Sequence, residues 1–179
     1  KDPTRPAFWY LSYAAPHPPL VPPKEYLEMY DQMEFSKPLE GEWTKEDPEK
    51  LPFAYQYYKN LYNWFDKNNR IDIAKKAYYA TCTYIDHQLR LVIGTLREQG
   101  LLEDTIILFT ADHGEMLGTH GLFGKFLMYE NSVKIPFILS PPASCGMVCN
   151  RVDDRIVELR DVMPTLLTLA GLKVPDYVE

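Results

Sequence analysis

The feature that most constrains the fold is an apolar, β-branched run, Thr105 to Thr110, which ends abruptly at Asp112-His113-Gly114. A short apolar run bounded by turn residues is typical of a buried strand, and it favours a parallel sheet covered on both faces. Ligands of open α/β sheets bind outside the carboxyl ends of the strands. The carboxylate and the imidazole that follow this strand are therefore predicted to lie where a ligand would bind.

A helical pattern precedes this strand. From Ile71 to Gln99, one helical face collects the apolar residues Ile73, Ala77, Ala80, Tyr84, Ile85, Leu89, Val92 and Leu96. Gly100 is the residue type that ends such a helix, and Leu101 supplies the apolar contact after it. The pattern predicts a long helix joined to the strand by a short link, as in α/β layer folds.

Further elements are predicted on either side. Pro6 to Ala15 is rich in aromatic residues and predicts a buried strand, followed by four prolines between 16 and 22 that exclude helix and sheet. Residues 36–69 predict an insertion or a substrate-side loop, with a short helix near 53–65. The other predictions are strands at 134–139 and 155–159 and helices at 24–33 and 161–170, the last with Asp161 as N-cap and Gly171 as stop.

Composition limits the function classes. The chain has 179 residues, 46% hydrophobic and 25% charged, which suits one folded domain and excludes a disordered or fibrous protein. A formal net charge of -6 argues against a general nucleic-acid or membrane-surface binder, so an anionic substrate would need a local cationic cluster. No run approaches the ~18 to 20 apolar residues of a membrane span. The first residues lack a signal-peptide pattern, and both ends are expected to be cut edges.

Cysteine usage leaves the compartment undecided. Cys82, Cys145 and Cys149 make an odd number and predict no disulfide framework. The segment Cys145-Gly-Met-Val-Cys149 could form a bridge or bind a soft metal, but a loop with two unpaired thiols is the favoured interpretation.

Four residues are candidates for a metal-assisted anion site. Asp112 offers an oxygen ligand and neutral His113 a nitrogen ligand for a divalent ion; the alternative is a plain turn. Lys125 is either a solvated lysine or a point charge beside a bound oxyanion. His17 is either a loop histidine without a task or a general acid held by rigid prolines. Since this segment offers too few carboxylates for a metal with three or more ligands, Asp112 and His113 are interpreted as half of a site.

Neighbouring residues bear on that interpretation. His120 could support the site or be structural. The glycines of this segment would permit close backbone approach of a ligand; they are Gly114, Gly118, Gly121 and Gly124.

Several motifs follow one another in an order typical of a known family. They are Phe8 to Leu20 with its Pro16-His17-Pro18-Pro19, the helical stretch Tyr84 to Leu89, Thr105 to Gly118, Gly124-Lys125, Ile135 to Ile138 and Asp161 to Gly171. Together they resemble the sulfatase family of the alkaline-phosphatase superfamily, and only about residues 36–69 fall outside the match. The Asp-His form, followed by Gly-Thr-His-Gly and a lysine, is similar to iduronate-type sulfatases, choline sulfatases and phosphonate monoester hydrolases.

The resemblance implies a fold and a set of roles. Residues 1–179 would be part of an alkaline-phosphatase-like three-layer αβα sandwich with a mostly parallel sheet. Asp112 and His113 would be ligands of a divalent cation, commonly Ca²⁺, with Mg²⁺ or Mn²⁺ in some relatives. Lys125 and His17 would bind the sulfate and stabilise or protonate the leaving oxygen.

The resemblance also implies a missing part. The family's nucleophile is a cysteine converted to formylglycine in a Cys-x-Pro/Ala-x-Arg motif, which none of the three cysteines fits, and the family's paired aspartates are absent from their expected place. The chain therefore resembles the second half of a sulfatase catalytic domain. It would need the remaining N-terminal half of the same protein and is expected to be inactive alone.

Alternatives remain open at this point. The same residues would accept a phosphonate or phosphate ester, and a homologue without the nucleophile would be a non-catalytic anion-binding or glycan-binding module. The aromatic residues between 43 and 64 could stack on a sugar or aryl ring, but packing of the insertion onto the domain is the favoured interpretation.

Overall fold

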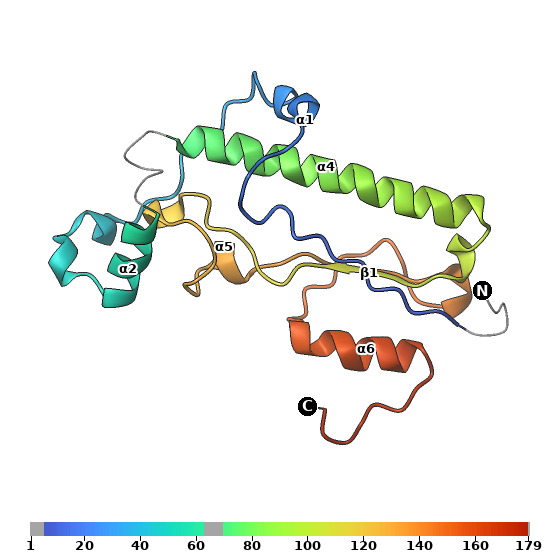
Figure 1. Ribbon diagram of the computed structural model, residues 1–179. Coiled ribbons are helices and arrows are strands. Elements are labelled where there is room, and N and C mark those ends of the chain that lie inside the picture. The colour runs from blue at the N-terminus through green and yellow to red at the C-terminus, as the bar shows by residue number, and fades with distance from the viewer. Residues whose placement is uncertain (1–5, 63–69, 179) are drawn as a thin grey trace.

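A computed structural model describes residues 6–62 and 70–178, and its longest element is helix α4 (Ile71–Glu98), which runs along one side of the molecule (Figure 1). The face predicted to be apolar is buried or half-buried along its length, with the exception of Ile73, which is exposed. Ala77 and Ala80 form its most buried part, where small side chains let other segments approach the helix closely. The predicted helix is confirmed.

The end of α4 is also as predicted. Gly100 has a positive φ of 66°, and its N–H donates to the carbonyl of Arg97 at 3.0 Å. The N–H of Leu101 donates to the carbonyl of Leu96 at 2.8 Å. These two bonds satisfy carbonyls that the helix leaves without partners, and they turn the chain back beneath the helix.

The chain returns through a 3₁₀ turn (Leu102–Asp104) into strand β1 (Ile107–Thr110), which pairs with strand β2 (Phe137–Ser140). The pairing is antiparallel, with Ile107 opposite Ser140 and Thr110 opposite Phe137. The parallel arrangement expected for the first strand is therefore wrong for this neighbour. A continuous apolar run indicates that both faces of a strand can be buried, but it carries no information about the direction of the adjacent strand.

The segment Pro6 to Ala15 differs from its prediction. It has no regular secondary structure in this chain, and its aromatic side chains lie in solvent: Phe8 is 74% exposed and Tyr10 is 80% exposed. Aromatic and β-branched residues favour a strand because they pack against neighbours on a sheet. Among the described residues no strand pairs with this segment, and the segment stays largely exposed, so the buried strand does not form here.

Helix α1 (Lys24–Glu28) is shorter than the predicted helix at 24–33 and packs on α4 through aromatic residues (Figure 1). The hydroxyl of Tyr26 and Nδ1 of His87 form a hydrogen bond of 3.0 Å, and the hydroxyls of Tyr30 and Thr83 form one of 2.6 Å. These bonds attach the segment with Tyr26 and Tyr30, which follows the proline loop, to helix α4.

In the region 36–69, the described residues 36–62 contain two 3₁₀ turns (Glu42–Lys45 and Pro48–Lys50) and helix α2 (Phe53–Leu61). The helix predicted near 53–65 ends at Leu61, and positions 63–65 lie outside the described residues. Tyr55 of α2 packs with residues of the loop after β1 in a small buried cluster, whose members are Leu51, Tyr55, Met116 and Leu122. Trp43 lies against Tyr55 with ring centroids 4.9 Å apart. The aromatic residues at these positions pack the region onto the domain, as favoured above.

The C-terminal part contains helices α5 (Glu130–Val133) and α6 (Val162–Leu169), the latter preceded by a 3₁₀ turn (Leu159–Asp161) and ended by Gly171 with a φ of 70°. Asp161 makes no side-chain cap on α6; instead its carboxylate accepts the N–H of Glu158 at 2.7 Å, one turn earlier.

The strand predicted at 155–159 is not formed. The carboxylate of Asp153 accepts both the backbone N–H of Arg155, at 3.2 Å, and its guanidinium, at 2.8 and 2.6 Å. A local bond of this kind takes the backbone donor that a strand would offer to its neighbour. The same bonds to Arg155 hold the pKa of Asp153 below its usual range.

Cys145 and Cys149 are free and exposed and Cys82 is free and half-buried, which agrees with the absence of a disulfide framework. No helix in the described ranges is both long and apolar enough to cross a membrane.

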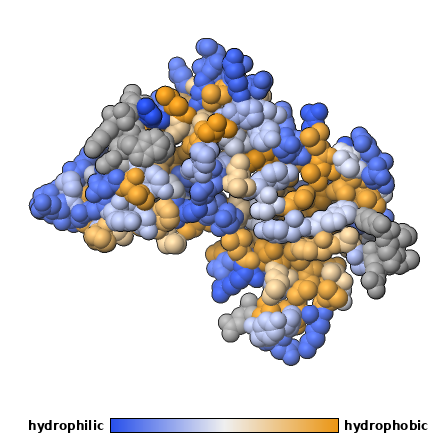
Figure 2. Space-filling model, in the orientation of Figure 1, coloured by the Kyte–Doolittle hydropathy of each residue, from blue (hydrophilic) through white to orange (hydrophobic). Residues whose placement is uncertain are grey.

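Apolar side chains are unusually frequent at the surface near the strand pair (Figure 2). They come from the N-terminal segment, both strands and α6, and include Phe8, Tyr10, Phe109, Ile138 and Met163. Exposed apolar surface of this extent marks a face that another part of a protein or a partner covers.

Candidate metal and anion site

The turn after β1 places the carboxylate of Asp112 beside the imidazole of His113. The imidazole Nδ1 of His113 lies 2.7 Å from the carbonyl oxygen of Gly114, which can only accept, so Nδ1 carries the proton. The lone pair of the neutral ring is then on Nε2, 3.5 Å from Oδ2 of Asp112. Two ligands of one ion lie about 3 to 3.5 Å apart when each bond is about 2.0 to 2.6 Å long.

The two side chains differ in burial in a way that suits this role. The side chain of His113 is 26% exposed, whereas that of Asp112 is 85% exposed. A backbone hydrogen bond that fixes the tautomer and orientation of a histidine is the usual second partner of a metal-bound imidazole. Asp112 remains free to turn toward an ion that approaches from solvent.

His17 reaches the same place from the other end of the chain. Its ring lies edge-on to the ring of His113, with centroids 6.4 Å apart and an interplanar angle of 71°. Its Nδ1 lies 2.8 Å from the carbonyl oxygen of Pro18, so this histidine also has its proton on Nδ1 and keeps Nε2 for another partner. The structure thus brings together three of the four predicted site residues.

The loop between His113 and Lys125 is closed by a carboxylate. Oε1 of Glu115 accepts the backbone N–H of Gly124 at 2.6 Å and that of Leu117 at 3.2 Å. Backbone bonds from Met116 to Gly124 (2.9 Å) and from Gly118 to Leu122 (2.8 Å) complete the closure. The chain therefore leaves the turn at Asp112 and His113 and returns toward it at Lys125.

Helix α5 fixes both ends of this loop. The N–H of Gly114 donates to the carbonyl of Ser132 at 2.7 Å, and the hydroxyl of Ser132 donates to the carbonyl of Lys125 at 2.6 Å. A Cβ on Gly114 would lie 2.1 Å from the carbonyl oxygen of Asn131. The close approach that this glycine permits is thus to the backbone of α5, and no ligand is needed to explain it.

Lys125 itself is half-buried, and within the described ranges its ammonium makes no hydrogen bond or ion pair. Its backbone is linked through hydrogen bonds of Ser132 to Gly114, beside Asp112 and His113. Its side chain is available to an anion. Its predicted role in sulfate binding stays a prediction.

His120 is structural. It has a φ of 56°, its N–H donates to the carbonyl of Leu39 at 2.7 Å, and its Nδ1 accepts the N–H of Gly41 at 3.2 Å. The hydroxyl of Tyr55 donates to its carbonyl at 2.8 Å. These bonds join the region 36–62 to the loop, and they engage the histidine away from the site.

Glu115 is a residue that the sequence reasoning missed. Burial is the largest cause of the raised pKa values of Tyr62 and Tyr78. The negative charge of Glu115 is a smaller cause that raises both. A carboxylate inside a glycine-rich loop was the available signal, because such a loop has unpaired N–H groups that a carboxylate can accept. Ser132 gave no comparable signal.

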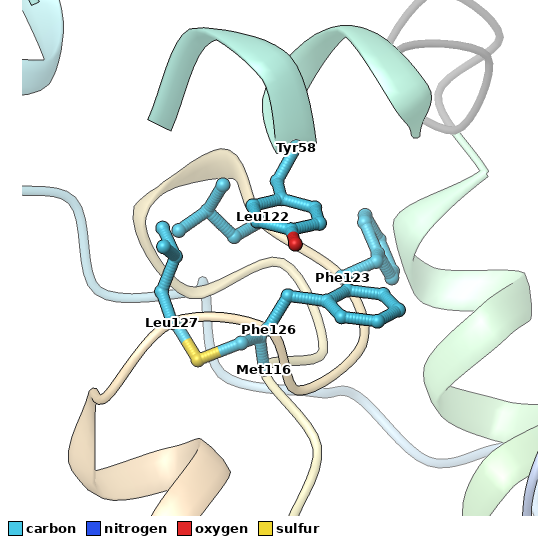
Figure 3. Close-up of a pocket in the computed structure, with 6 residues that line it drawn as sticks. All are labelled: Tyr58, Met116, Leu122, Phe123, Phe126 and Leu127. Atoms are coloured by element: carbon cyan, nitrogen blue, oxygen red, sulfur yellow. The ribbon is translucent and has the colours of Figure 1, made fainter. Parts of the chain in front are cut away.

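A depression beside the loop lies apart from these candidate residues. It is lined by apolar residues and is too narrow to hold a water molecule; Figure 3 shows these residues, which are Tyr58, Met116, Leu122, Phe123, Phe126 and Leu127. Tyr58 reaches into it from α2, and its ring stacks on that of Phe126 with centroids 4.6 Å apart. It is an interface between the loop and α2.

The described part of the chain does not supply a complete donor set for a metal. Among residues 6–62 and 70–178, no group of three or more His, Cys, Asp or Glu side chains is close enough to hold an ion. Asp112 and His113 fit as two ligands of a divalent cation, and further ligands would have to come from elsewhere.

Comparison with known proteins gives the family. The model of the Sulfatase family matches residues 1–172. An arylsulfatase of Clostridium perfringens is 41% identical over 182 residues, which cover 100% of this chain and 37% of that protein. A choline-sulfatase of Rhizobium meliloti is 27% identical and is matched over 96% of this chain and 33% of its own length.

A solved structure agrees with these sequences. The phosphonate monoester hydrolase SpPMH from Silicibacter pomeroyi superposes with a TM-score of 0.80 at 30% identity, covering 92% of this chain and 34% of that one. The chain belongs to the sulfatase family, as its motifs indicated. It spans about a third of the length of these relatives.

Proposed function

We propose that this chain is part of a catalytic domain that hydrolyses a sulfate monoester, and that Asp112, His113, His17 and Lys125 form its contribution to the active site. The observation that carries the proposal is the meeting of His17 with Asp112 and His113 at the end of β1. Two segments far apart in the sequence supply one acid–base group and two metal donors at one place, as family membership leads one to expect.

Asp112 and His113 would hold a divalent cation, with Ca²⁺ favoured and Mg²⁺ or Mn²⁺ as alternatives. When bound, the cation would stabilise negative charge on the sulfuryl oxygens and activate the nucleophile. The protein contributes the fixed orientation of His113, whose Nδ1–H is engaged by Gly114 so that Nε2 faces the ion.

Lys125 would hold the sulfate as a compact positive charge and would offset the charge that develops on its oxygens. His17 would assist departure of the alcohol. Because its Nδ1–H is held by the Pro18 carbonyl, Nε2 is the atom that would deliver a proton to the leaving oxygen when the ring is protonated.

The nucleophile would lie outside this chain. A formylglycine and the remaining metal ligands are expected in an N-terminal half of the same protein, which would also cover the exposed apolar side chains of segment 6–14 and the strand pair. In that complete domain we expect β1 to lie in the mostly parallel sheet of a three-layer αβα sandwich, with the pair β1–β2 as an antiparallel part of it.

The closest alternative is a phosphonate or phosphate ester hydrolase, which the likeness to SpPMH favours. A non-catalytic anion-binding or glycan-binding homologue is the other. Parallel assays of the full-length protein with an aryl sulfate and an aryl phosphonate ester decide between the two ester classes. Equal inactivity toward both, or an upstream coding sequence without Cys-x-Pro/Ala-x-Arg, would contradict the sulfatase proposal.

A further inference from the structure

One buried serine connects the turn that holds Asp112 and His113 with the segment that holds Lys125. Ser132 of α5 is 3% exposed, and it is bonded in two directions. Its carbonyl accepts the N–H of Gly114, directly after the metal-ligand pair, and its hydroxyl donates to the carbonyl of Lys125. Ser132 alone therefore links Gly114, which follows Asp112 and His113, to the backbone of Lys125 through two short hydrogen bonds.

The serine is itself held in place. The N–H of Ser132 donates to the carbonyl of Tyr129 at 2.8 Å. The ring of Tyr129 lies 4.9 Å from that of His120 and 6.3 Å from that of Trp43, in the aromatic packing between the loop and region 36–62. Ser132 is thus a fixed point against which the loop is positioned.

Glu115 acts on the residue before the lysine. Its carboxylate accepts the N–H of Gly124. The carbonyl of Gly124 accepts the N–H of Met116 at 2.9 Å, and the carbonyl of Lys125 accepts the hydroxyl of Ser132. The backbone on both sides of the lysine Cα is therefore restrained. Restraint of this kind holds a charged group in the geometry that it needs for binding, at a lower entropic cost.

We infer that Ser132 and Glu115 are positioning residues that set the placement of Lys125 relative to Asp112 and His113, and so determine how tightly the site holds a sulfuryl anion. The inference rests on the proposed function, because it assigns the anion to Lys125. Neither residue touches the substrate; both act through the lysine.

The test uses the full-length protein with Ser132→Ala, which removes only the bond to Lys125 and leaves the backbone bond to Gly114. We expect the inhibition constant of inorganic sulfate and the KM of an aryl sulfate to rise about 3- to 10-fold, the range of one hydrogen bond, with the bound metal content unchanged. The matched control is Thr81→Val, which removes another buried hydroxyl that donates to a carbonyl, in α4 and outside the site.

A double-mutant cycle separates positioning from general stability. In a Lys125→Ala background, Ser132→Ala should have no further effect on sulfate binding, because the group through which it acts is gone. An equal effect in both backgrounds, or a Ser132→Ala variant that behaves like Thr81→Val, would overturn the inference. If Ser132→Ala does not fold, Glu115→Ala and Glu115→Gln decide it in the same cycle, the glutamine retaining an acceptor oxygen and most of the binding.

Failure of the proposed function gives a different result. If the wild-type protein hydrolyses no sulfate ester, the proposed activity is wrong, while calorimetric binding of inorganic sulfate still measures the cycle between positions 125 and 132. An active wild-type protein with no coupling between these positions contradicts the positioning role alone.

Discussion

The loop from Asp112 to Ser132 and the segment from Pro6 to His17 bring residues to the same site by different means. The loop is closed by its own hydrogen bonds, from Glu115, Ser132 and a set of backbone pairs. The N-terminal segment has no regular structure, and its apolar side chains are exposed. The segment with Asp112, His113 and Lys125 is thus held by local bonds, whereas we expect the segment with His17 to need further elements that cover it.

The largest effect is expected from removal of a metal ligand. Asp112→Ala in the full-length protein should lower metal affinity and kcat/KM by at least about 100-fold, because loss of even a supporting partner of a ligand costs 10- to 100-fold. Metal content by elemental analysis and steady-state kinetics measure this. Asp86→Ala, at an exposed position of α4, is the control and should change neither. Retention of full metal content in Asp112→Ala would contradict the assignment.

The substitution Gly114→Ala tests whether the packing of α5 against the loop stabilises the protein. An alanine there would place its Cβ 2.1 Å from the Asn131 carbonyl, so α5 and the loop would have to separate, at a cost of about 1 to 3 kcal/mol of unfolding free energy. Denaturant unfolding measures the change.

Gly94→Ala is the matched control for this substitution. Gly94 lies inside α4 with no atom near its Cβ position, so alanine there should stabilise the helix by about 0.5 to 1 kcal/mol. Equal behaviour of the two alanine variants would show that α5 does not hold the loop.

The dependence of the N-terminal segment on other elements is tested by two exposed phenylalanines. Phe8 is 74% and Phe53 80% exposed in this chain. In the full-length protein Phe8→Ser should destabilise by about 1.5 to 3 kcal/mol, because the rest of the domain is expected to bury Phe8. Phe53→Ser, on α2, should stay within about 0.5 kcal/mol. If Phe8→Ser is as neutral as Phe53→Ser, segment 6–14 is not covered.

The smallest effect concerns alkaline pH. Burial, with lesser contributions from Cys82 and Glu115, raises the pKa of Tyr78, so the folded state favours the protonated phenol. The stability that follows is fully present below the ordinary tyrosine pKa of about 10 and is lost as pH rises through the raised value. Thermal unfolding from about pH 9 to 11 should therefore show a shallower fall in Tm for Tyr78→Phe than for the wild type, whereas Tyr177→Phe, at an exposed position, should not differ from it.

Sequence patterns predicted the parts of this structure that depend on local interactions. The face of α4, its end at Gly100 and the turn after β1 follow from spacing and from residue types that act within a few positions. The direction of the strand beside β1 and the burial of the segment from Pro6 to Ala15 depend on neighbours distant in sequence. For the described chain, the predicted parallel neighbour and the predicted buried strand were both wrong.

The same distinction holds for the site. Residue type and motif were enough to propose Asp112, His113 and His17, which the structure brings together, but they gave no sign of the bond from Ser132 to Lys125. Its hydroxyl bonds a backbone carbonyl, and every residue has one, so no side-chain pattern marks the pair. Lys125 was proposed from the motif, and its role awaits measurement.

We have proposed that Asp112, His113, His17 and Lys125 serve one site for a metal and a sulfuryl anion. A crystal structure of the full-length protein grown with Ca²⁺ and inorganic sulfate would show this site. We expect a cation bound by Asp112 Oδ2 and His113 Nε2, at about 2.0 to 2.6 Å, with a sulfate that receives hydrogen bonds from Lys125 Nζ and His17 Nε2. A cation bound elsewhere, or a sulfate at this cation that neither Lys125 nor His17 contacts, would contradict it.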